Sequence, residues 1–196
     1  MTGVTAILLA AGLSQRFGAA NKLLLEIDGQ AMARRVAAAI CASQAARVVV
    51  VLGHQADQVA TVLAGLNLET VINPLYSDGQ VSSVRAGVAA VNDDATGFMM
   101  CLADQPQLQA GDYDALIDAF NTQPDRVVVP YVGKKRGNPV VLPIALRDRI
   151  LAGGVNEGCR SFIDSHPQLV RQFHVTNDGY RDDFDTAEHF STLVSK

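Results

Sequence analysis

The feature that most constrains the fold is a series of short apolar runs of strand length, separated by stretches with helical spacing. The runs occupy residues 4–11, 47–52, 68–72, 97–102, 126–130, 138–142 and 170–175. Several are apolar almost throughout, which is typical of strands covered on both faces. Strands that alternate with helices predict an α/β protein, with a mostly parallel central sheet in a three-layer arrangement.

The intervening stretches carry apolar residues three and four positions apart, which indicates helices. The predicted helices occupy residues 30–43, 54–64, 82–88, 111–121, 144–152 and 157–165, and a last one opens within 183–188. No repeat or low-complexity linker interrupts this order. With 196 residues, 48% of them hydrophobic and 18% charged, the chain is expected to form a single domain over residues 1–196.

The overall charge and the ends of the chain exclude some classes of partner. A net charge of −4 argues against a nucleic acid as the main partner, although a nucleotide can still bind at a local cationic loop. No apolar run approaches the roughly 18 residues of a membrane helix, and no secretory signal pattern opens the chain. An odd number of widely spaced cysteines favours reduced thiols. We therefore expect a cytoplasmic protein without a membrane partner.

A loop with two glycines and two cations follows the first apolar run. Backbone N–H groups can approach an anion closely at Gly12 and Gly18, which lack a Cβ. Arg16 and Lys22 can neutralise the anion, and Ser14 adds a hydroxyl. The usual dinucleotide and P-loop glycine fingerprints are absent. The pattern indicates a nucleotide- or phosphate-binding loop of another kind, and the alternative is an ordinary strand-to-helix turn with surface cations.

Carboxylates stand at two further places where ligands bind in α/β sheets. Asp104 comes directly after the buried run 97–102, where it can either bind Mg²⁺ or begin a turn. Asp183 and Asp185 flank Phe184, so an extended segment would aim both carboxylates the same way. Asp185 can equally cap the last helix.

Two other segments hold candidate ligand-binding groups. Ser82 and Arg85 lie where a helix can begin with its N–H groups facing a ligand, or can simply be capped. The basic turn 134–136 precedes Asn138 and Pro139, and it is either a solvated loop or part of a site for a second anionic substrate. No histidines are spaced as metal pairs, and no Gly-x-Ser-x-Gly motif indicates a hydrolase.

Four of these segments match a known family signature in order. The matching segments are Leu-Ala-Ala-Gly-x-Ser-x-Arg-x-Gly with a following Lys at residues 9–22, Asp-Gln-Pro at 104–106, Gly-Asn-Pro-Val at 137–140 and Asp-x-Asp-Thr-x-Glu at 183–188. The chain therefore resembles the MobA-like nucleotidyltransferases of the molybdenum cofactor, in particular their cytidylyltransferase (MocA-like) branch. Three departures stand out: Phe17 replaces Met, His189 replaces an acidic residue, and residues 156–160 follow the pattern loosely.

The resemblance implies a Rossmann-like nucleotidyltransferase fold and the transfer of CMP from CTP to the phosphate of molybdopterin, with release of pyrophosphate. It implies Arg16, Lys22 and Asp104 as catalytic residues and Asp104 with Asp185 as ligands of Mg²⁺. Ala11, where the guanylyl-transferring branch tends to have Gly, favours CTP.

The resemblance also implies two sets of binding residues. The nucleotide would contact Leu9, Ala10, Ala11, Gly12, Ser14, Lys22 and Ser82. The second substrate would contact Arg85, Asn138 and Pro139, and a client molybdoenzyme is a further expected partner. No general base is needed, because the attacking phosphate is already an anion.

Three other functions fit parts of the pattern. The same opening loop serves nucleotidyltransferases that act on a sugar or polyol phosphate. A non-catalytic maturation factor for a molybdoenzyme is a second alternative, although such a binder has no need for Arg16, Lys22, Asp104 and Asp185 together. A dinucleotide-dependent oxidoreductase, as some relatives of the family have been named, is disfavoured by the missing glycine fingerprint.

Overall fold

The structure, a computed structural model, describes residues 2–14, 21–152 and 160–182, and the statements below concern these residues. Its centre is an eight-stranded sheet with the order β10-β7-β9-β6-β1-β4-β5, in which β8 pairs with β7 beside this path. The strands are β1 (Val4–Ala10), β4 (Arg47–Leu52), β5 (Glu69–Ile72), β6 (Gly97–Leu102), β7 (Val127–Val132), β8 (Lys135–Arg136), β9 (Val140–Pro143) and β10 (Val170–Val175). The predicted strands therefore all form, with ends shifted by one or two residues.

The predicted mostly parallel sheet is confirmed. β1 lies in parallel register with both β4 and β6, β4 pairs with β5, and β7 pairs with β10 in the same way. In the described sheet, β9 runs antiparallel to β6 and β7, and β8 runs antiparallel to β7. β9 runs antiparallel to β7 because the connection between these two strands is short, and a parallel crossover needs a dozen or more residues.

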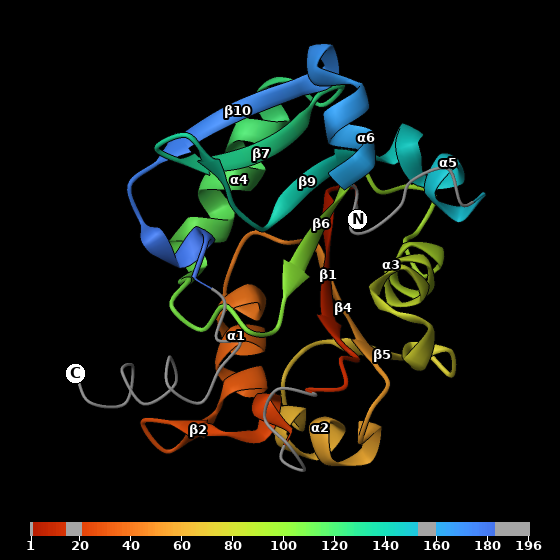
Figure 1. Cartoon of the computed structure of the whole chain (residues 1–196), viewed down its shortest axis with the longest axis vertical. Coiled ribbons are helices and arrows are strands. Elements are labelled where there is room, and N and C mark those ends of the chain that lie inside the picture. Colours follow the sequence, from red (N-terminus) through yellow and green to blue (C-terminus); the bar gives the residue numbers. More distant parts are fainter. Residues whose placement is uncertain (1, 15–20, 153–159, 183–196) are drawn as a thin grey trace.

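Helices cover both faces of the sheet, which confirms the three layers (Figure 1). One face carries α1 (Met32–Cys41), α2 (Ala56–Leu63) and α4 (Ala110–Thr122), and the other carries α3 (Gln80–Ala89), α5 (Arg147–Leu151) and α6 (Arg160–Ser165). Alternate side chains of a strand face opposite layers. Ala6 and Leu8 of β1 thus belong to the core under α1, and Ile7 to the core under α3. Two buried faces explain the continuous apolar runs.

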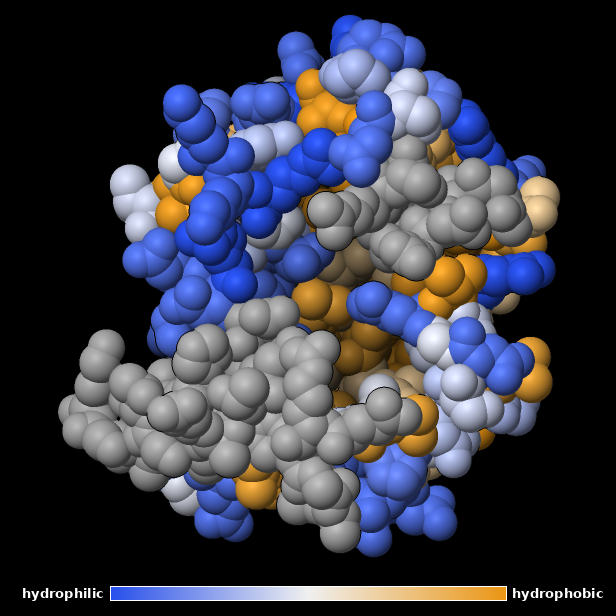
Figure 2. All heavy atoms as spheres, in the orientation of Figure 1, coloured by the Kyte–Doolittle hydropathy of each residue, from blue (hydrophilic) through white to orange (hydrophobic). Residues whose placement is uncertain are grey.

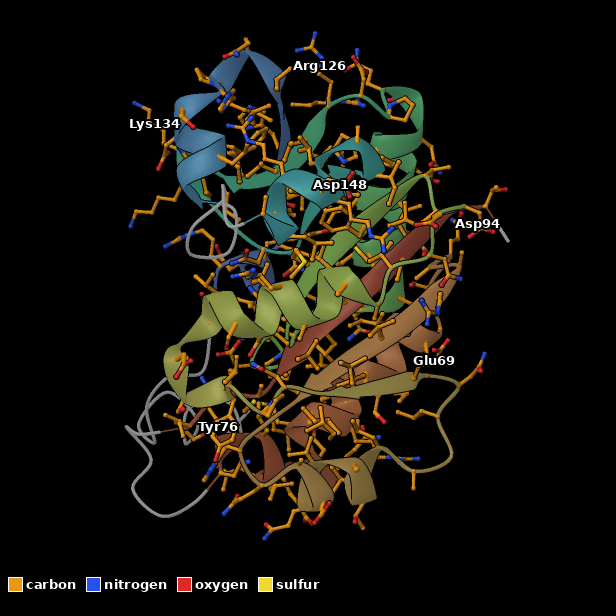
Figure 3. All side chains as sticks on the ribbon, turned by 90° about the vertical axis from the view of Figure 1, so that its right-hand side faces the viewer. Glu69, Tyr76, Asp94, Arg126, Lys134 and Asp148 are labelled. Atoms are coloured by element: carbon orange, nitrogen blue, oxygen red, sulfur yellow. The ribbon has the colours of Figure 1, made fainter. Side chains whose placement is uncertain are left out.

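The helix α3 packs unusually close to the sheet because it carries a glycine at the contact. A Cβ on Gly87 would lie 2.4 Å from Cγ2 of Ile7 and 2.9 Å from Cγ2 of Val51. In Figure 3, α3 crosses in front of the central strands. The close contact holds the last turn of α3 against the middle of β1 and the end of β4.

A small hairpin stands between the first strand and the first helix. It consists of a 3-10 turn, η2 (Lys22–Leu24), and the strands β2 (Glu26–Ile27) and β3 (Gln30–Ala31). Asp28 and Gly29 at its tip have φ values of 52° and 74°, as the tight turns of two-residue hairpins require. Helix α1 thus begins only after residues 11–31, and not directly after β1.

Shorter elements complete the described chain. They are the 3-10 turns η3 (Tyr76–Asp78), η4 (Ile144–Leu146), η5 (Pro167–Leu169) and η6 (Asp178–Tyr180). The predicted helix over 144–152 is in fact η4 followed by α5. The predicted helix at 183–188 lies outside the described residues. Among the described helices, none has the length and apolar character needed to span a bilayer.

Candidate active site

The candidate site lies at the edge where the parallel strands end. β1, β4, β5 and β6 share this edge, and β9 begins there because Val140 pairs with Met100 near the end of β6. Figure 3 shows Tyr76 and Lys134 towards this edge, whereas Glu69 and Asp94 lie towards the opposite one. Figure 2 shows the surface hollowed near the ends of β1 and β6, with apolar residues at the bottom. Ligands bind at this edge in open α/β sheets.

The loop after β1 is held by hydrogen bonds to the neighbouring loops. The Leu9 carbonyl accepts from the N–H of Ala103 (3.3 Å), and the Ala11 carbonyl accepts from the N–H of His54 (3.3 Å). Ala10 and Ala11 are buried, while Gly12 is exposed at the surface. Side chains this small leave the backbone of the loop open to a ligand.

Ser14 and Asn21 stand on either side of residues 15–20. This part of the loop, which carries Arg16, Phe17 and Gly18, lies outside the described residues. Ser14 has a left-handed backbone, with φ 51°. Its hydroxyl accepts a hydrogen bond from the N–H of Lys22 (3.2 Å) and donates one to Oδ1 of Asn21 (3.3 Å). Asn21 is buried, and its Oδ1 also accepts from the N–H of Leu23 (3.0 Å). The two residues thus fix the backbone from which the Lys22 side chain leaves.

Lys22 and Asp104 meet across the edge. Nζ of Lys22 donates to Oδ2 of Asp104 at 2.6 Å, and their side chains are only 15% and 17% exposed. The prediction that the opening loop and the end of the fourth apolar run share one site is therefore consistent with the geometry. A cation and a carboxylate in partial burial interact more strongly than a pair at the open surface.

The second carboxylate oxygen of Asp104 is suited to a metal ion. Oδ1 is buried and accepts no hydrogen bond from the described residues. A buried, unsatisfied carboxylate oxygen is costly unless a cation or donor completes it, and Mg²⁺ prefers hard oxygen ligands. The residues present therefore fit a divalent cation. The expected second ligand, Asp185, lies outside the described residues, among which no group of three acidic, His or Cys side chains forms a metal site.

The predicted nucleotide-binding residue Ser82 belongs to a network at the start of α3. Its hydroxyl shares its one proton between the carbonyls of Leu75 (2.7 Å) and Gly79 (2.8 Å) and accepts from Nδ2 of Asn73. Nδ2 of Asn73, which is buried, also donates to Oγ of Ser83 at 3.0 Å. The hydroxyl of Ser82 thus shapes the 76–83 loop.

The predicted second-substrate residues lie in different surroundings. The Arg85 side chain is exposed and donates from Nη2 to the carbonyl of Leu151 (2.9 Å). Asn138 and Pro139 are joined by a cis peptide at the start of β9, and the N–H of Asn138 donates to the carbonyl of Tyr180 (2.7 Å). Arg136, from the basic turn, is held by Tyr131 and Asp164.

Three residues of this edge were not among the predicted site residues. Gln105 stands inside the Asp-Gln-Pro segment, but neither its burial nor that of Asn73 could be read from the sequence. Tyr180 is 2% exposed, and burial raises the pKa of its hydroxyl, with the nearby Asp112 adding to the effect. The phenol therefore stays protonated and donates to the carbonyl of Asp112 at 2.7 Å.

Comparison with known proteins identifies the family. Residues 6–170 match the family model described as the MobA-like NTP transferase domain. The chain belongs to this family of nucleotidyltransferases, which confirms the resemblance read from its motifs. The fold of the described residues, a mostly parallel sheet with the candidate site at its carboxyl edge, agrees with this assignment.

Individual relatives are similar over the whole chain. Nicotine blue oxidoreductase of Paenarthrobacter nicotinovorans is 30% identical over 202 residues, covering 97% of this chain and 96% of its own. Rv0371c of Mycobacterium tuberculosis H37Rv has a similar structure, with a TM-score of 0.84, 23% identity and coverage of 100% and 99%. A manganese complex of Rv0371c matches with a TM-score of 0.81 at 21% identity, covering 100% of this chain and 99% of that one.

A member of the molybdenum branch shares the fold as well. Molybdopterin-guanine dinucleotide biosynthesis protein A of Archaeoglobus fulgidus matches with a TM-score of 0.72, 12% identity and coverage of 98% and 97%. At such identities, the structural matches establish the architecture of the chain. The substrate has to be inferred from the chemistry of the site.

Proposed function

We propose that this nucleotidyltransferase transfers CMP from CTP to the phosphate of molybdopterin. In this reaction a phosphate oxygen of the acceptor forms a bond to the α-phosphorus, and the bond to the leaving pyrophosphate breaks. The observation that carries the proposal is the pair of Lys22 and Asp104 at the carboxyl edge, with Oδ1 of Asp104 left to a cation. Two anions must meet in this reaction, so positioning and positive charge reduce the barrier.

The triphosphate would be held on the β1 side of the edge. The backbone N–H groups of the loop after Ala11, together with Arg16, would bind its oxygens. Lys22 would stabilise the charge that builds up at the α-phosphate, since its ammonium group lies beside the Asp104 carboxylate after β6. The exposed Gly12 allows close approach of an anion, because no side chain stands in the way.

Asp104 and Asp185 would hold Mg²⁺. The chemistry that the ion supplies when bound is neutralisation of charge on phosphate oxygens. Support for a divalent cation comes from the unsatisfied Oδ1 of Asp104 and from the manganese complex of the similar Rv0371c. Asp104 would keep Oδ2 on Lys22 while Oδ1 binds the cation, and so hold the cation and the ammonium group in a fixed relation.

The choice of cytosine and of molybdopterin rests on fewer residues. Ala10, Ala11 and the 76–83 loop would surround the base, with Leu9 supporting the backbone and Ser14 and Ser82 fixing the two loops. Arg85, Asn138 and Pro139 would bound the second substrate. A client molybdoenzyme would receive the product, and a cytoplasmic location would suit this exchange.

The decisive measurement is pyrophosphate release from the purified chain with Mg²⁺, molybdopterin and each nucleoside triphosphate in turn. We expect release with CTP and a cytidylated product by mass spectrometry. Release with GTP instead, or with a sugar or polyol phosphate as acceptor, would replace the proposed substrates and keep the nucleotidyltransferase chemistry. Binding of molybdopterin without turnover would favour the maturation factor.

The similarity to nicotine blue oxidoreductase supports a second candidate, a redox reaction on an aromatic substrate. The geometry disfavours it for a nicotinamide cofactor bound in the usual way. In a dinucleotide fold, a glycine-rich turn leads straight from the first strand into a helix whose N-terminus holds the pyrophosphate. Here the loop after β1 lacks the Gly-x-Gly-x-x-Gly pattern of such a turn, and residues 11–14, which follow β1 directly, are not helical. Consumption of NADH or NADPH with nicotine blue as acceptor would show that this second reaction occurs.

A further inference from the structure

Two neighbouring arginines of α1 hold different parts of the structure. Arg34 donates from Nη1 to the carbonyls of Val62 (2.8 Å) and Ala64 (2.9 Å) at the end of α2. Arg35 donates from Nε to the carbonyl of Pro106 at 3.1 Å. Both arginines are half-buried. The first side chain thus joins two helices, whereas the second joins α1 to the loop that follows β6.

A carboxylate of the β2–β3 hairpin orients the Arg35 guanidinium. Oδ2 of Asp28, at the tip of the hairpin, accepts from Nη1 of Arg35 at 2.9 Å. The Asp28 side chain is 76% exposed, so the ion pair adds little to stability. It does fix the direction of the guanidinium, whose Nε lies on the Pro106 carbonyl. Because the hairpin directly follows η2, Arg35 bridges the segment of Lys22 to the loop of Asp104.

The same two segments are therefore joined at two places. Nζ of Lys22 contacts Oδ2 of Asp104 at 2.6 Å, and Nε of Arg35 contacts the Pro106 carbonyl at 3.1 Å. In the proposed function, phosphate oxygens compete for the ammonium group and a divalent cation binds the carboxylate. The second contact uses a guanidinium and a backbone carbonyl that the reaction does not need. It can hold the loop whatever charge the substrate brings to the first contact.

The backbone between the Pro106 carbonyl and Asp104 has little freedom to rotate. The proline ring fixes φ of Pro106, and a residue that precedes proline is restricted to extended conformations. That residue, Gln105, is 1% exposed, and its side-chain amide donates to a carbonyl of η6 at 3.2 Å. On the other side, the N–H of Ala103 donates to the Leu9 carbonyl. Holding the Pro106 carbonyl therefore fixes the backbone from which the Asp104 carboxylate leaves.

We infer that Arg35 is a positioning residue for Asp104. By holding the Pro106 carbonyl, it keeps Oδ2 of Asp104 on the Lys22 ammonium group and Oδ1 available to the divalent cation. The inference rests on the proposed function, which assigns that cation to Asp104. Asp28 has a smaller part, since it acts only through Arg35. Residues that orient a metal ligand typically change metal affinity by about 10- to 100-fold when they are replaced.

Mn²⁺ alone is the probe, and its binding is measured from the electron paramagnetic resonance signal of the free ion. Arg35→Met keeps an apolar stem and removes the donor, so we expect it to weaken Mn²⁺ binding about tenfold. Arg34→Met is the matched control, because it removes the same group from the adjacent residue while its partners lie on α2. It should change Mn²⁺ affinity by less than about twofold. Asp28→Asn should have an effect between the two.

A double-mutant cycle separates positioning from general damage to α1. In a Lys22→Met background, Arg35→Met should weaken Mn²⁺ binding by about thirtyfold or more, because Asp104 then lacks both contacts. General damage would give the same factor in both backgrounds. The metal-free Tm of every variant confirms that folded proteins are compared. If Arg35→Met does not fold, Arg35→Lys takes its place in the cycle, since lysine keeps the charge and cannot form the same fork of hydrogen bonds.

The outcomes distinguish this inference from the proposed function. Equal losses from Arg35→Met and Arg34→Met, an equal factor in the two Lys22 backgrounds, or no loss at all would overturn the positioning role and leave the metal site standing. No binding of Mn²⁺ by the unsubstituted chain would overturn the metal assignment of Asp104, and this inference with it. Neither result depends on which nucleotide or acceptor the protein uses.

Discussion

The candidate site has two sides that are built differently. On the side of β1, β4 and β5, the side-chain hydrogen bonds within the loops join residues close in sequence, such as Ser14 with Lys22 and Asn73 with Ser82. On the side of β6 and β9, they join residues far apart, such as Gln105 with Gly179. The first side thus depends on local loop geometry, whereas the second depends on the packing of the whole sheet. Lys22 and Asp104 connect the two sides.

Removing the carboxylate that connects the two sides should have the largest effect. We expect Asp104→Ala to lower pyrophosphate release by at least about a thousandfold, because both the cation and Lys22 lose a partner. The fold should be retained, since Asp104 lies in a loop after β6. Release is measured with CTP and molybdopterin, and circular dichroism reports the fold. Asp118→Ala, at an exposed position of α4, is the control, and near-full activity of Asp104→Ala would remove the metal assignment.

Removing the cation from the local side should be the next largest change. Lys22→Met should lower kcat about a hundredfold and change KM for CTP much less, because the charge it stabilises develops in the transition state. Steady-state kinetics separate the two constants. Lys135→Met, at an exposed position of β8, should change neither. A rise in KM with an unchanged kcat would mean that Lys22 only binds the ground state.

Adding a side chain where α3 packs on the sheet should destabilise the strands that carry the β1 side of the site. Gly87→Ala places a Cβ 2.4 Å from Ile7, so we expect a loss of about 1–3 kcal/mol in the free energy of unfolding. Urea denaturation measures it. Gly111→Ala is the matched control within a helix and should stabilise the protein by about 0.5–1 kcal/mol. Equal effects of the two substitutions would show that α3 does not pack as closely as described.

A surface pair at the opposite edge should matter least. Nε of Arg47 donates to Oε1 of Glu69 at 2.6 Å, and this hydrogen bond lowers the pKa of the Glu69 carboxyl below its ordinary value of 4.5. The stabilisation is therefore complete above the unfolded pKa and is lost as the pH falls through the lower folded pKa. Since Glu69 is exposed, Glu69→Gln should cost less than about 1 kcal/mol near pH 7.

The pH series checks the sign of this last effect. The difference in unfolding free energy between the two proteins should vanish at a pH low enough to protonate Glu69 in the folded chain. Urea titrations between pH 7 and pH 3 follow it, with Asp118→Asn as the control. A difference that grows at low pH would contradict the stated direction of the pKa shift.

Local patterns in the sequence predicted the strands, the helical segments of both layers and the loop at the end of β1. They worked because period, turn chemistry and burial on two faces are expressed within a few neighbouring residues, as in residues 97–102. The antiparallel direction of β9 was not predicted, since it follows from a connection length that became clear only with the bounds of β7 and β9. The roles of Arg16 and Asp185 stay predictions.

By itself, the sequence determined the α/β class, the family and the residue types that gather at one edge of the sheet. The tertiary structure decided which of them touch: Nζ of Lys22 reaches Asp104, while Gln105 and Asn138 turn towards η6. The physical reason is that strand and turn preferences are local. Contacts between residues 42 to 82 positions apart arise only when the buried faces of the sheet and its helices pack together.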